Sequence, residues 1–290
     1  MSGVDGVDGV SVGGGVSGVD EVERTGGDHD AGGVSGVNST AMRHMRTLFR
    51  IEWKLFNRIK SNYIFVLLVP VMILMAMRFV QEQLDLGEHG LQPGPLMVST
   101  ATGILLIFSL YSSVTGLYVA RREELVLKRL RTGEVSDPVI LAGGASMYVA
   151  ICVVQIVAVA VVLSVMFGAV PRQPFSAVMG LITGVALMTA MAAATAALCR
   201  TVESVLVATL PAIFILPMIS GVYIPREVLP DALGEALLFA PLSSTVDLVR
   251  SGWTGELSMS GVLGRSVLAL AWTGVFAWIA ARRFRWEPRT

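Results

Sequence analysis

Six long apolar runs constrain the fold of this chain more than any other feature. They occupy residues 61–80, 96–119, 146–167, 175–198, 205–223 and 263–281. A helix of about 20 apolar residues crosses a hydrocarbon core roughly 30 Å thick. Lipid cannot hydrogen-bond a backbone, so only helices or closed barrels span it, and the sequence lacks the alternating strands of a barrel. We therefore expect an all-α polytopic membrane protein with six transmembrane helices, built from residues 41–290.

Residues 1–40 form a low-complexity tail rich in Gly, Val, Asp and Ser. Such a stretch cannot bury enough apolar surface to offset the entropy cost of ordering it, so we predict that it is disordered. It has neither the basic start nor the apolar core of a secretory signal. The sequence does not indicate a role for it.

The amino-acid composition changes abruptly at residue 42. Through residues 42–60, basic residues recur at intervals of three and four. They are Arg43, Arg46, Arg50, Lys54 and Arg58. Apolar residues such as Leu48, Phe49 and Phe56 fill the positions between them. This pattern predicts an amphipathic helix that lies among lipid headgroups before the first span. We prefer this interpretation to nucleic-acid binding.

A charged loop, residues 121–138, separates the second and third runs and reads RREELVLKRLRTGEVSDP. Its charges would each cost roughly 2.5–3.5 kcal/mol inside hydrocarbon, so the loop must lie outside it. Leu125, Val126, Leu127 and Leu130 recur at helical spacing and predict a short helix with one apolar side. Gly133 ends this helix, and Asp137 with Pro138 begins the next. A helical, half-apolar loop is suited to docking a cytoplasmic partner.

The distribution of Lys and Arg predicts the orientation. Six lie in residues 42–60, five in the charged loop and four after residue 281. By the positive-inside rule, both termini and the charged loop are cytoplasmic.

The segment of about 40 residues between the fifth and sixth runs, residues 221–261, is too apolar for a free loop. Pro225, Pro230 and Pro241 divide it into pieces too short to span. We expect re-entrant or interfacial helices at the outer leaflet and call residues 221–261 the outer segment.

Small residues and prolines distinguish two of the runs. Gly180 and Gly184, followed by several alanines, favour close helix packing in the fourth run. Pro211 and Pro217 each remove a helix hydrogen bond and predict a kink in the fifth. No Asp, Glu, Lys or His lies deep in any run, which disfavours a proton- or ion-coupled secondary transporter.

Three features together resemble the membrane subunit of type-2 ATP-binding-cassette (ABC) exporters, a family that includes drug, antibiotic and polysaccharide exporters. They are the amphipathic entry helix, the charged loop, and the sequence around the end of the fifth run. In the last, Ser220, Gly221, Pro225, Pro230, Pro241, Leu242 and Arg250 match the family signature. Ser243 and Ser244 replace the more usual Thr-Tyr, and the tail has no counterpart.

The resemblance implies two six-span subunits around a substrate path, here expected to be copies of this chain, on two cytoplasmic ATPase subunits. The ATPase would contact a coupling helix in the charged loop, with Glu123, Glu124, Leu127, Lys128, Leu130, Arg131 and Pro138 as its residues. The outer segment would gate the path through Ser220, Gly221, Pro225, Pro230, Pro241 and Arg250. No G-x-x-x-x-G-K-S/T loop occurs, so ATP is used by the partner and this chain binds no cofactor.

The expected function is ATP-driven export across the plasma membrane. Apolar and small residues in the spans favour amphipathic or hydrophobic cargo, such as a drug, a peptide antibiotic or a lipid-linked molecule. Polysaccharide export and a non-transporting assembly or immunity partner stay open as alternatives. An intramembrane enzyme is disfavoured because His29, His44 and His89 lie outside the spans. Cys152 and Cys199 are expected to be small buried hydrophobes, without a metal site.

Overall fold

The computed structural model describes residues 92–124, 137–223, 226, 229–283 and four helical positions, Met72, Met75, Ala76 and Phe79. All of these belong to one compact unit, Ser39–Thr290. The predicted tail, the predicted amphipathic helix and most of the first apolar run lie outside the described residues. Predictions for these regions stay predictions.

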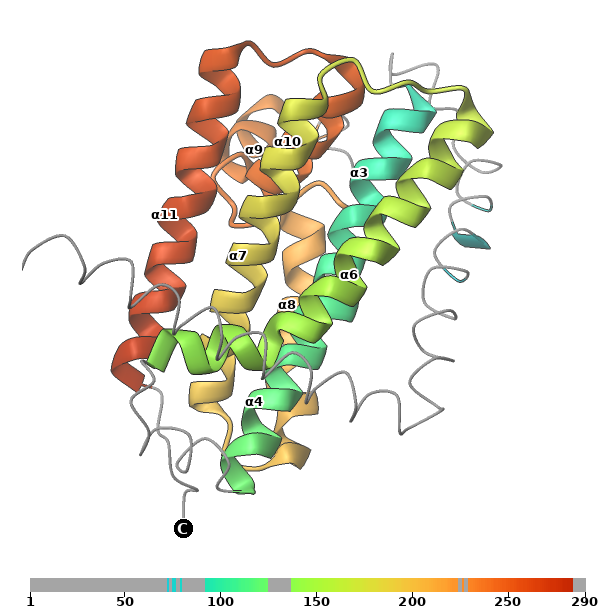
Figure 1. Ribbon diagram of the computed structural model, residues 1–290. Coiled ribbons are helices and arrows are strands. Elements are labelled where there is room, and N and C mark those ends of the chain that lie inside the picture. The colour runs from blue at the N-terminus through green and yellow to red at the C-terminus, as the bar shows by residue number, and fades with distance from the viewer. Residues whose placement is uncertain are drawn as a thin grey trace, which may run out of the picture. The chain divides into compact units, whose positions relative to one another are not determined.

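Every regular element in the described part of the chain is a helix (Figure 1). The elements are α3 (Pro93–Leu105), η1 (Leu106–Ser112), α4 (Ser113–Glu123), α6 (Asp137–Phe167), α7 (Pro174–Leu198), α8 (Val202–Ile219), α9 (Asp231–Leu237), α10 (Ser243–Thr254) and α11 (Met259–Arg283). Five helices are long and apolar enough to cross a membrane: the continuous α3–η1–α4, and α6, α7, α8 and α11. The all-α class is thereby confirmed for the described residues, and the second to sixth predicted spans correspond to these five candidate membrane-spanning helices.

Local sequence explains where these helices begin and end. Proline occupies the first turn of α3 and of α7, where its missing N–H has no intrahelical partner to lose. Gly255 ends α10 in the left-handed conformation, at φ 71°, a region that favours glycine. At the start of α8, the hydroxyl of Ser204 accepts a hydrogen bond of 3.2 Å from the backbone N–H of Thr201.

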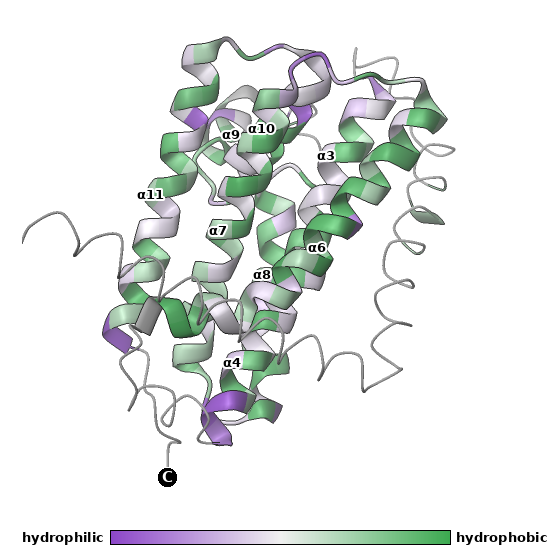
Figure 2. Cartoon of the chain, in the orientation of Figure 1, coloured by the Kyte–Doolittle hydropathy of each residue, from purple (hydrophilic) through white to green (hydrophobic). Residues whose placement is uncertain are grey.

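Helix α7 lies at the centre of the packing and contacts α11, α10, α4, η1 and α8 (Figure 1). Apolar residues dominate the long helices, whereas hydrophilic residues gather at the end of α4 and at the far end of α11 (Figure 2). Many large apolar side chains of α6, α8 and α11 are exposed, including Val165, Leu206 and Val267. Such surfaces are typical of helices that face lipid or a partner subunit.

Small residues allow α10 to approach α7 closely, as the sequence predicts for Gly180 and Gly184. A Cβ atom on Gly180 would lie 2.9 Å from Cγ2 of Val249, and one on Gly184 would lie 2.6 Å from Cγ2 of Thr245. Gly252 of α10 also allows this close contact, since a Cβ atom added there would lie 2.5 Å from Cβ of Ala177 in α7. No larger side chain fits at these three positions without displacing a neighbour.

The second span contains a π-helical segment, η1, between its two α-helical parts. Two polar side chains of η1 bond to neighbouring helices. Ser109 donates a hydrogen bond of 2.5 Å to Gln155 of α6, and the hydroxyl of Tyr111 lies 3.1 Å from that of Thr195 in α7. Segments of this kind are rare and often occur at functional sites.

Candidate functional site

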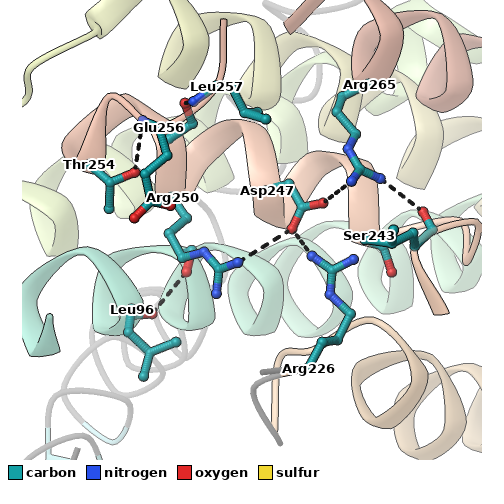
Figure 3. Close-up of polar contacts among 12 residues, drawn as sticks. Leu96, Arg226, Ser243, Asp247, Arg250, Thr254, Glu256, Leu257 and Arg265 are labelled. Atoms are coloured by element: carbon teal, nitrogen blue, oxygen red, sulfur yellow. Dashed lines mark hydrogen bonds and ion pairs between the residues drawn. The ribbon is translucent and has the colours of Figure 1, made fainter. Parts of the chain in front are cut away.

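Two charged clusters lie beside opposite ends of α7. The first cluster centres on Asp247 of α10, whose carboxylate contacts three arginines (Figure 3). Arg226 forms a hydrogen-bonded ion pair with Oδ1, and Nη2 of Arg265 lies 3.4 Å from Oδ2. Nη2 of Arg250 lies 3.9 Å from Oδ1. We call these four residues the outer cluster.

Three separate elements supply the outer cluster. Arg226 follows α8, Asp247 and Arg250 lie three residues apart on α10, and Arg265 lies on α11. Gly221 makes room for the side chain of Arg226. It adopts φ 73°, and a Cβ there would lie 3.2 Å from Cγ of Arg226. Glycine is therefore favoured both by the backbone conformation and by the position of the arginine.

The central ion pair is deeply buried, because the side chains of Arg226 and Asp247 are each 7% exposed. A charge removed from water in this way is stable only when partners satisfy it. Arg265 also donates a hydrogen bond of 3.3 Å to the carbonyl oxygen of Leu238, at the end of α9. The outer cluster consequently fixes α9, α10, α11 and the turn after α8 against one another.

A cavity of about 440 Å³ adjoins the outer cluster. All four cluster residues line it, and Glu235 and Glu256 add exposed carboxylates. Leu229, Leu238 and Leu257 supply apolar surface. The cavity therefore offers both charge signs beside apolar walls.

The structure places the predicted gating residues in several environments. Ser220 is buried at the end of α8, Pro230 directly precedes α9, and Pro241 lies in the turn between α9 and α10. Arg250 joins the outer cluster. Pro225 lies outside the described residues. The outer segment does contain two short helices, α9 and α10, and their depth in the membrane stays a prediction.

The sequence analysis did not identify Asp247, Arg226 and Arg265 as site residues. One signal was available. Asp247 and Arg250 have opposite charges three residues apart, the spacing at which side chains meet on one helix face, in an otherwise uncharged helix. The arginines from other elements carried no such signal, since only the fold brings them to Asp247.

The second cluster lies where the charged loop begins. Arg122, in the last turn of α4, is completely buried and binds three carbonyl oxygens at the end of α7 and just beyond it. Nη1 donates to Ala196 at 3.1 Å, and Nη2 donates to Cys199 at 2.8 Å and to Arg200 at 3.2 Å. The next residue, Glu123, accepts a hydrogen bond of 2.9 Å from the backbone N–H of Val202.

We call Arg122, Glu123 and these backbone partners the α4 clamp. Its charges match the helix ends that they contact. The last carbonyls of a helix are unpaired and carry partial negative charge, which suits a guanidinium, whereas the first N–H groups carry partial positive charge, which suits a carboxylate. Arg122 thus binds the end of α7, and Glu123 binds the start of α8.

Other predicted coupling residues are only partly described. Glu124 is exposed directly after α4, and α6 begins at Asp137 and Pro138, the residues expected to start the next helix. Leu127, Lys128, Leu130 and Arg131 lie outside the described residues. The sequence analysis treated Arg122 as one charge of an exposed loop and did not foresee its burial.

A second, apolar cavity of about 500 Å³ lies between α4, α6, α7 and α11. Alanines form much of its wall, including Ala142, Ala186, Ala190 and Ala277. The hydroxyl of Tyr118 lies at its edge and donates a hydrogen bond of 2.9 Å to the carbonyl of Leu141. The cavity can hold an apolar group but offers few polar contacts.

Both cysteines, Cys152 and Cys199, are buried free thiols, which confirms their prediction as small buried hydrophobes. Within the described ranges, no group of three or more His, Cys, Asp or Glu side chains could hold a metal ion.

The family model described as "ABC-2 type transporter" matches residues 43–253. The matched region includes the whole α4 clamp and, in the outer cluster, Arg226, Asp247 and Arg250. No curated protein matches the chain.

Proposed function

The chain belongs to the ABC-2 type transporter family and is a membrane permease of a type-2 ABC transporter; on that premise we propose that it provides the path of an ATP-driven exporter. In this proposal, two copies of the chain pair around the path in the plasma membrane. Two copies of a separate ATPase drive them from the cytoplasm, where both termini lie.

The α4 clamp is the observation that carries the proposed ATPase coupling. It fixes the last turn of α4 to the ends of two other helices, directly before the charged loop. On the far side of the loop, α6 begins at Asp137 and continues as a single helix to Phe167. A protein that pushes on the loop would therefore act on fixed helix ends, rather than on a flexible tether.

The sequence supports a separate subunit for ATP hydrolysis. The 290 residues contain no G-x-x-x-x-G-K-S/T loop to cradle nucleotide phosphates. We therefore propose that a separate ATPase subunit binds and hydrolyses ATP. This chain would supply the path and the surface on which the ATPase docks.

The outer cluster supports a gate at the other end of the path. It joins α9 and α10, both too short to span a membrane, to the ends of α8 and α11. Ion pairs between different elements can exchange partners when those elements shift. We propose that α9 and α10 cap the path and that rearrangement of the outer cluster accompanies opening.

The cargo is proposed to be amphipathic or hydrophobic. The alanine-lined cavity, with Tyr118 as one of its few polar groups, supports this class over a strongly hydrated polymer. Export of a polysaccharide, and a non-transporting assembly or immunity role, are the alternatives.

The first experiment tests ATPase docking. Leu127→Asp combined with Leu130→Asp would place two carboxylates on the apolar side of the predicted coupling helix, and the proposed partner ATPase should no longer co-purify. Val170→Asp is the matched control, because Val170 is a 75% exposed apolar residue between α6 and α7. Unchanged co-purification of the double variant would contradict the docking role.

A second experiment tests the cargo class. Cells that express the chain with its ATPase are loaded with a panel of hydrophobic drugs, and retention is compared with cells in which the ATPase is inactive. Lower retention with the active enzyme is expected. Equal retention across the panel would contradict drug export and favour the alternatives.

A further inference from the structure

We propose that Arg122 and Glu123 are positioning residues that transmit movement of the charged loop to α8, through the turn that joins α7 and α8. The proposal rests on the proposed function, in which an ATPase moves the charged loop. It adds a route. The loop is covalently continuous with α4 and α6, whereas the α4 clamp connects it to a helix that begins 79 residues after Glu123.

Arg122 provides the fixed half of this connection. Its planar guanidinium reaches three carbonyl oxygens at 3.1, 2.8 and 3.2 Å, and its side chain is fully buried. The fork of N–H groups has a rigid geometry, so three simultaneous bonds define the direction of the side chain as well as its distance. The end of α4 cannot rotate or slide along α7 without breaking several of them.

Glu123 provides the half that can respond. Its carboxylate accepts a hydrogen bond from Val202, the first residue of α8, in an exposed position. Water can replace an exposed bond at little cost, unlike the buried bonds of Arg122. When α4 moves, Arg122 therefore carries the end of α7 with it, and Glu123 either draws the start of α8 along or releases it.

Helix α8 has the features of an element that moves. Pro211 and Pro217 lie inside it and remove two backbone donors from its hydrogen-bond ladder. About 22% of its apolar stretch is buried, against 50% in α7 and 17% in α11, which contains no proline. Low burial and missing hydrogen bonds are what distinguish segments that move at low cost from those that stay fixed.

The far end of α8 leads to the outer cluster. The backbone N–H groups of Val222 and Tyr223 donate to the carbonyl of Pro217 at 3.0 and 3.3 Å, and Arg226 then binds Asp247. A displacement of Val202 along the helix axis would thus reach the turn that holds Arg226. The described contacts connect the charged loop to the proposed gate through a single helix.

A fluorescent label on α8 tests this route. The native thiols are first removed by Cys152→Ala and Cys199→Ala. The α4 clamp is kept, because Arg122 binds the backbone carbonyl of residue 199 and not its side chain. Tyr223→Cys, at a 47% exposed position after α8, then carries an environment-sensitive bimane label. Val170→Cys, after α6, carries the same label in a parallel preparation.

The key variants alter Glu123, because its side chain is exposed and its replacement leaves the buried hydrogen bonds of Arg122 in place. In the reconstituted complex with its ATPase, ATP with vanadate should change the emission of both labels. Glu123→Ala should abolish the change at residue 223 and keep the change at residue 170. Glu123→Gln, which retains an acceptor oxygen, should restore the response at residue 223.

Two further variants complete the design. Arg122→Gln should also abolish the response at residue 223. Glu203→Gln is the control and should leave both responses intact, since Glu203 is an exposed acid in the same first turn of α8 that interacts with Thr201 of its own turn.

The results separate this inference from the proposed function. A wild-type response at residue 223 in Glu123→Ala would overturn the route through the α4 clamp, with the exporter still supported. Loss of both responses together with loss of ATPase binding would also overturn it, because Glu123 would then belong to the docking surface. If the ATPase does not bind the wild-type chain, the proposed function itself fails, and the route with it.

Discussion

Asp247 of α10 and Arg226, in the turn after α8, form an ion pair of which each side chain is only 7% exposed. Arg250 and Arg265 approach the same carboxylate. One negative charge therefore holds three positive charges from three elements, and the arrangement depends on that single residue.

Replacement of Asp247 by Asn should be strongly destabilising. The change preserves shape but leaves the three arginines facing one another without the carboxylate. Removal of one partner from a buried ion pair typically costs about 3–5 kcal/mol. Thermal unfolding in detergent, followed by fluorescence-detected size exclusion, measures the loss. Glu256→Gln, at an exposed position lining the same cavity, should change the stability by less than about 0.5 kcal/mol. Equal melting of Asp247→Asn and wild type would contradict the structural role of the outer cluster.

Replacement of Gly252 by Ala should destabilise the contact between α7 and α10. The new methyl group would lie 2.5 Å from Cβ of Ala177 and 3.1 Å from its backbone atoms, which cannot move aside. Overpacking of this kind costs about 1–3 kcal/mol.

The matched control is Gly274→Ala on α11, where a Cβ would meet nothing within 4 Å. Alanine is favoured over glycine in a helix by up to about 1 kcal/mol, so this variant should be neutral or stabilised. Chemical denaturation of both variants in the same detergent measures the difference. A stable Gly252→Ala would show that α10 is not held tightly against α7.

Replacement of Pro217 by Ala should make α8 more rigid. The new N–H can donate to the carbonyl of Ile213, a bond that proline prevents. Amide hydrogen exchange of residues 213–219 should slow, and ATP-driven export should fall without loss of stability. Pro174→Ala tests the specificity of the effect, because a proline in the first turn of α7 interrupts no hydrogen bond. Unchanged export by Pro217→Ala would show that bending of α8 is not required.

The orientation in the membrane is testable with single cysteines in the same cysteine-free background. Val170→Cys, between α6 and α7, should react with an impermeant maleimide in intact cells. Glu203→Cys, at the start of α8, should react only after permeabilisation, because the positive-inside rule places that end in the cytoplasm. Both residues are exposed in the structure. The reverse pattern would place the charged loop outside the cell and exclude ATPase docking there.

Hydropathy predicted a span closely where the apolar run and the helix begin and end at nearly the same residues. The fourth run, residues 175–198, matches α7 almost residue for residue, because Pro174 begins the helix and its last residue, Leu198, is followed by the turn at Arg200. The third apolar run begins at residue 146, whereas the helix that contains it, α6, begins at Asp137, where the sequence pattern of Asp137 and Pro138 predicted a helix start. Hydropathy reports the apolar part of a helix, and α6 continues beyond it through Gly143 and Gly144.

The two charged clusters were harder to predict, for a physical reason. Arg122 binds carbonyl oxygens 74 to 78 residues away, and a backbone carbonyl has no residue type that a sequence can reveal. The residues around Pro241 were recognised from the family resemblance, which drew attention to Arg250. Asp247 was missed, because its importance comes from the convergence of three arginines on it rather than from a motif.

The π-helical segment η1 has a consequence for the length of the second span. Each residue of an α-helix turns the chain by about 100°. A single deletion between Leu105 and Ser113 would therefore rotate every later residue of the second span about the helix axis. Arg122 would then point away from the carbonyls of Cys199 and Arg200. We therefore expect the number of residues in this segment to be invariant.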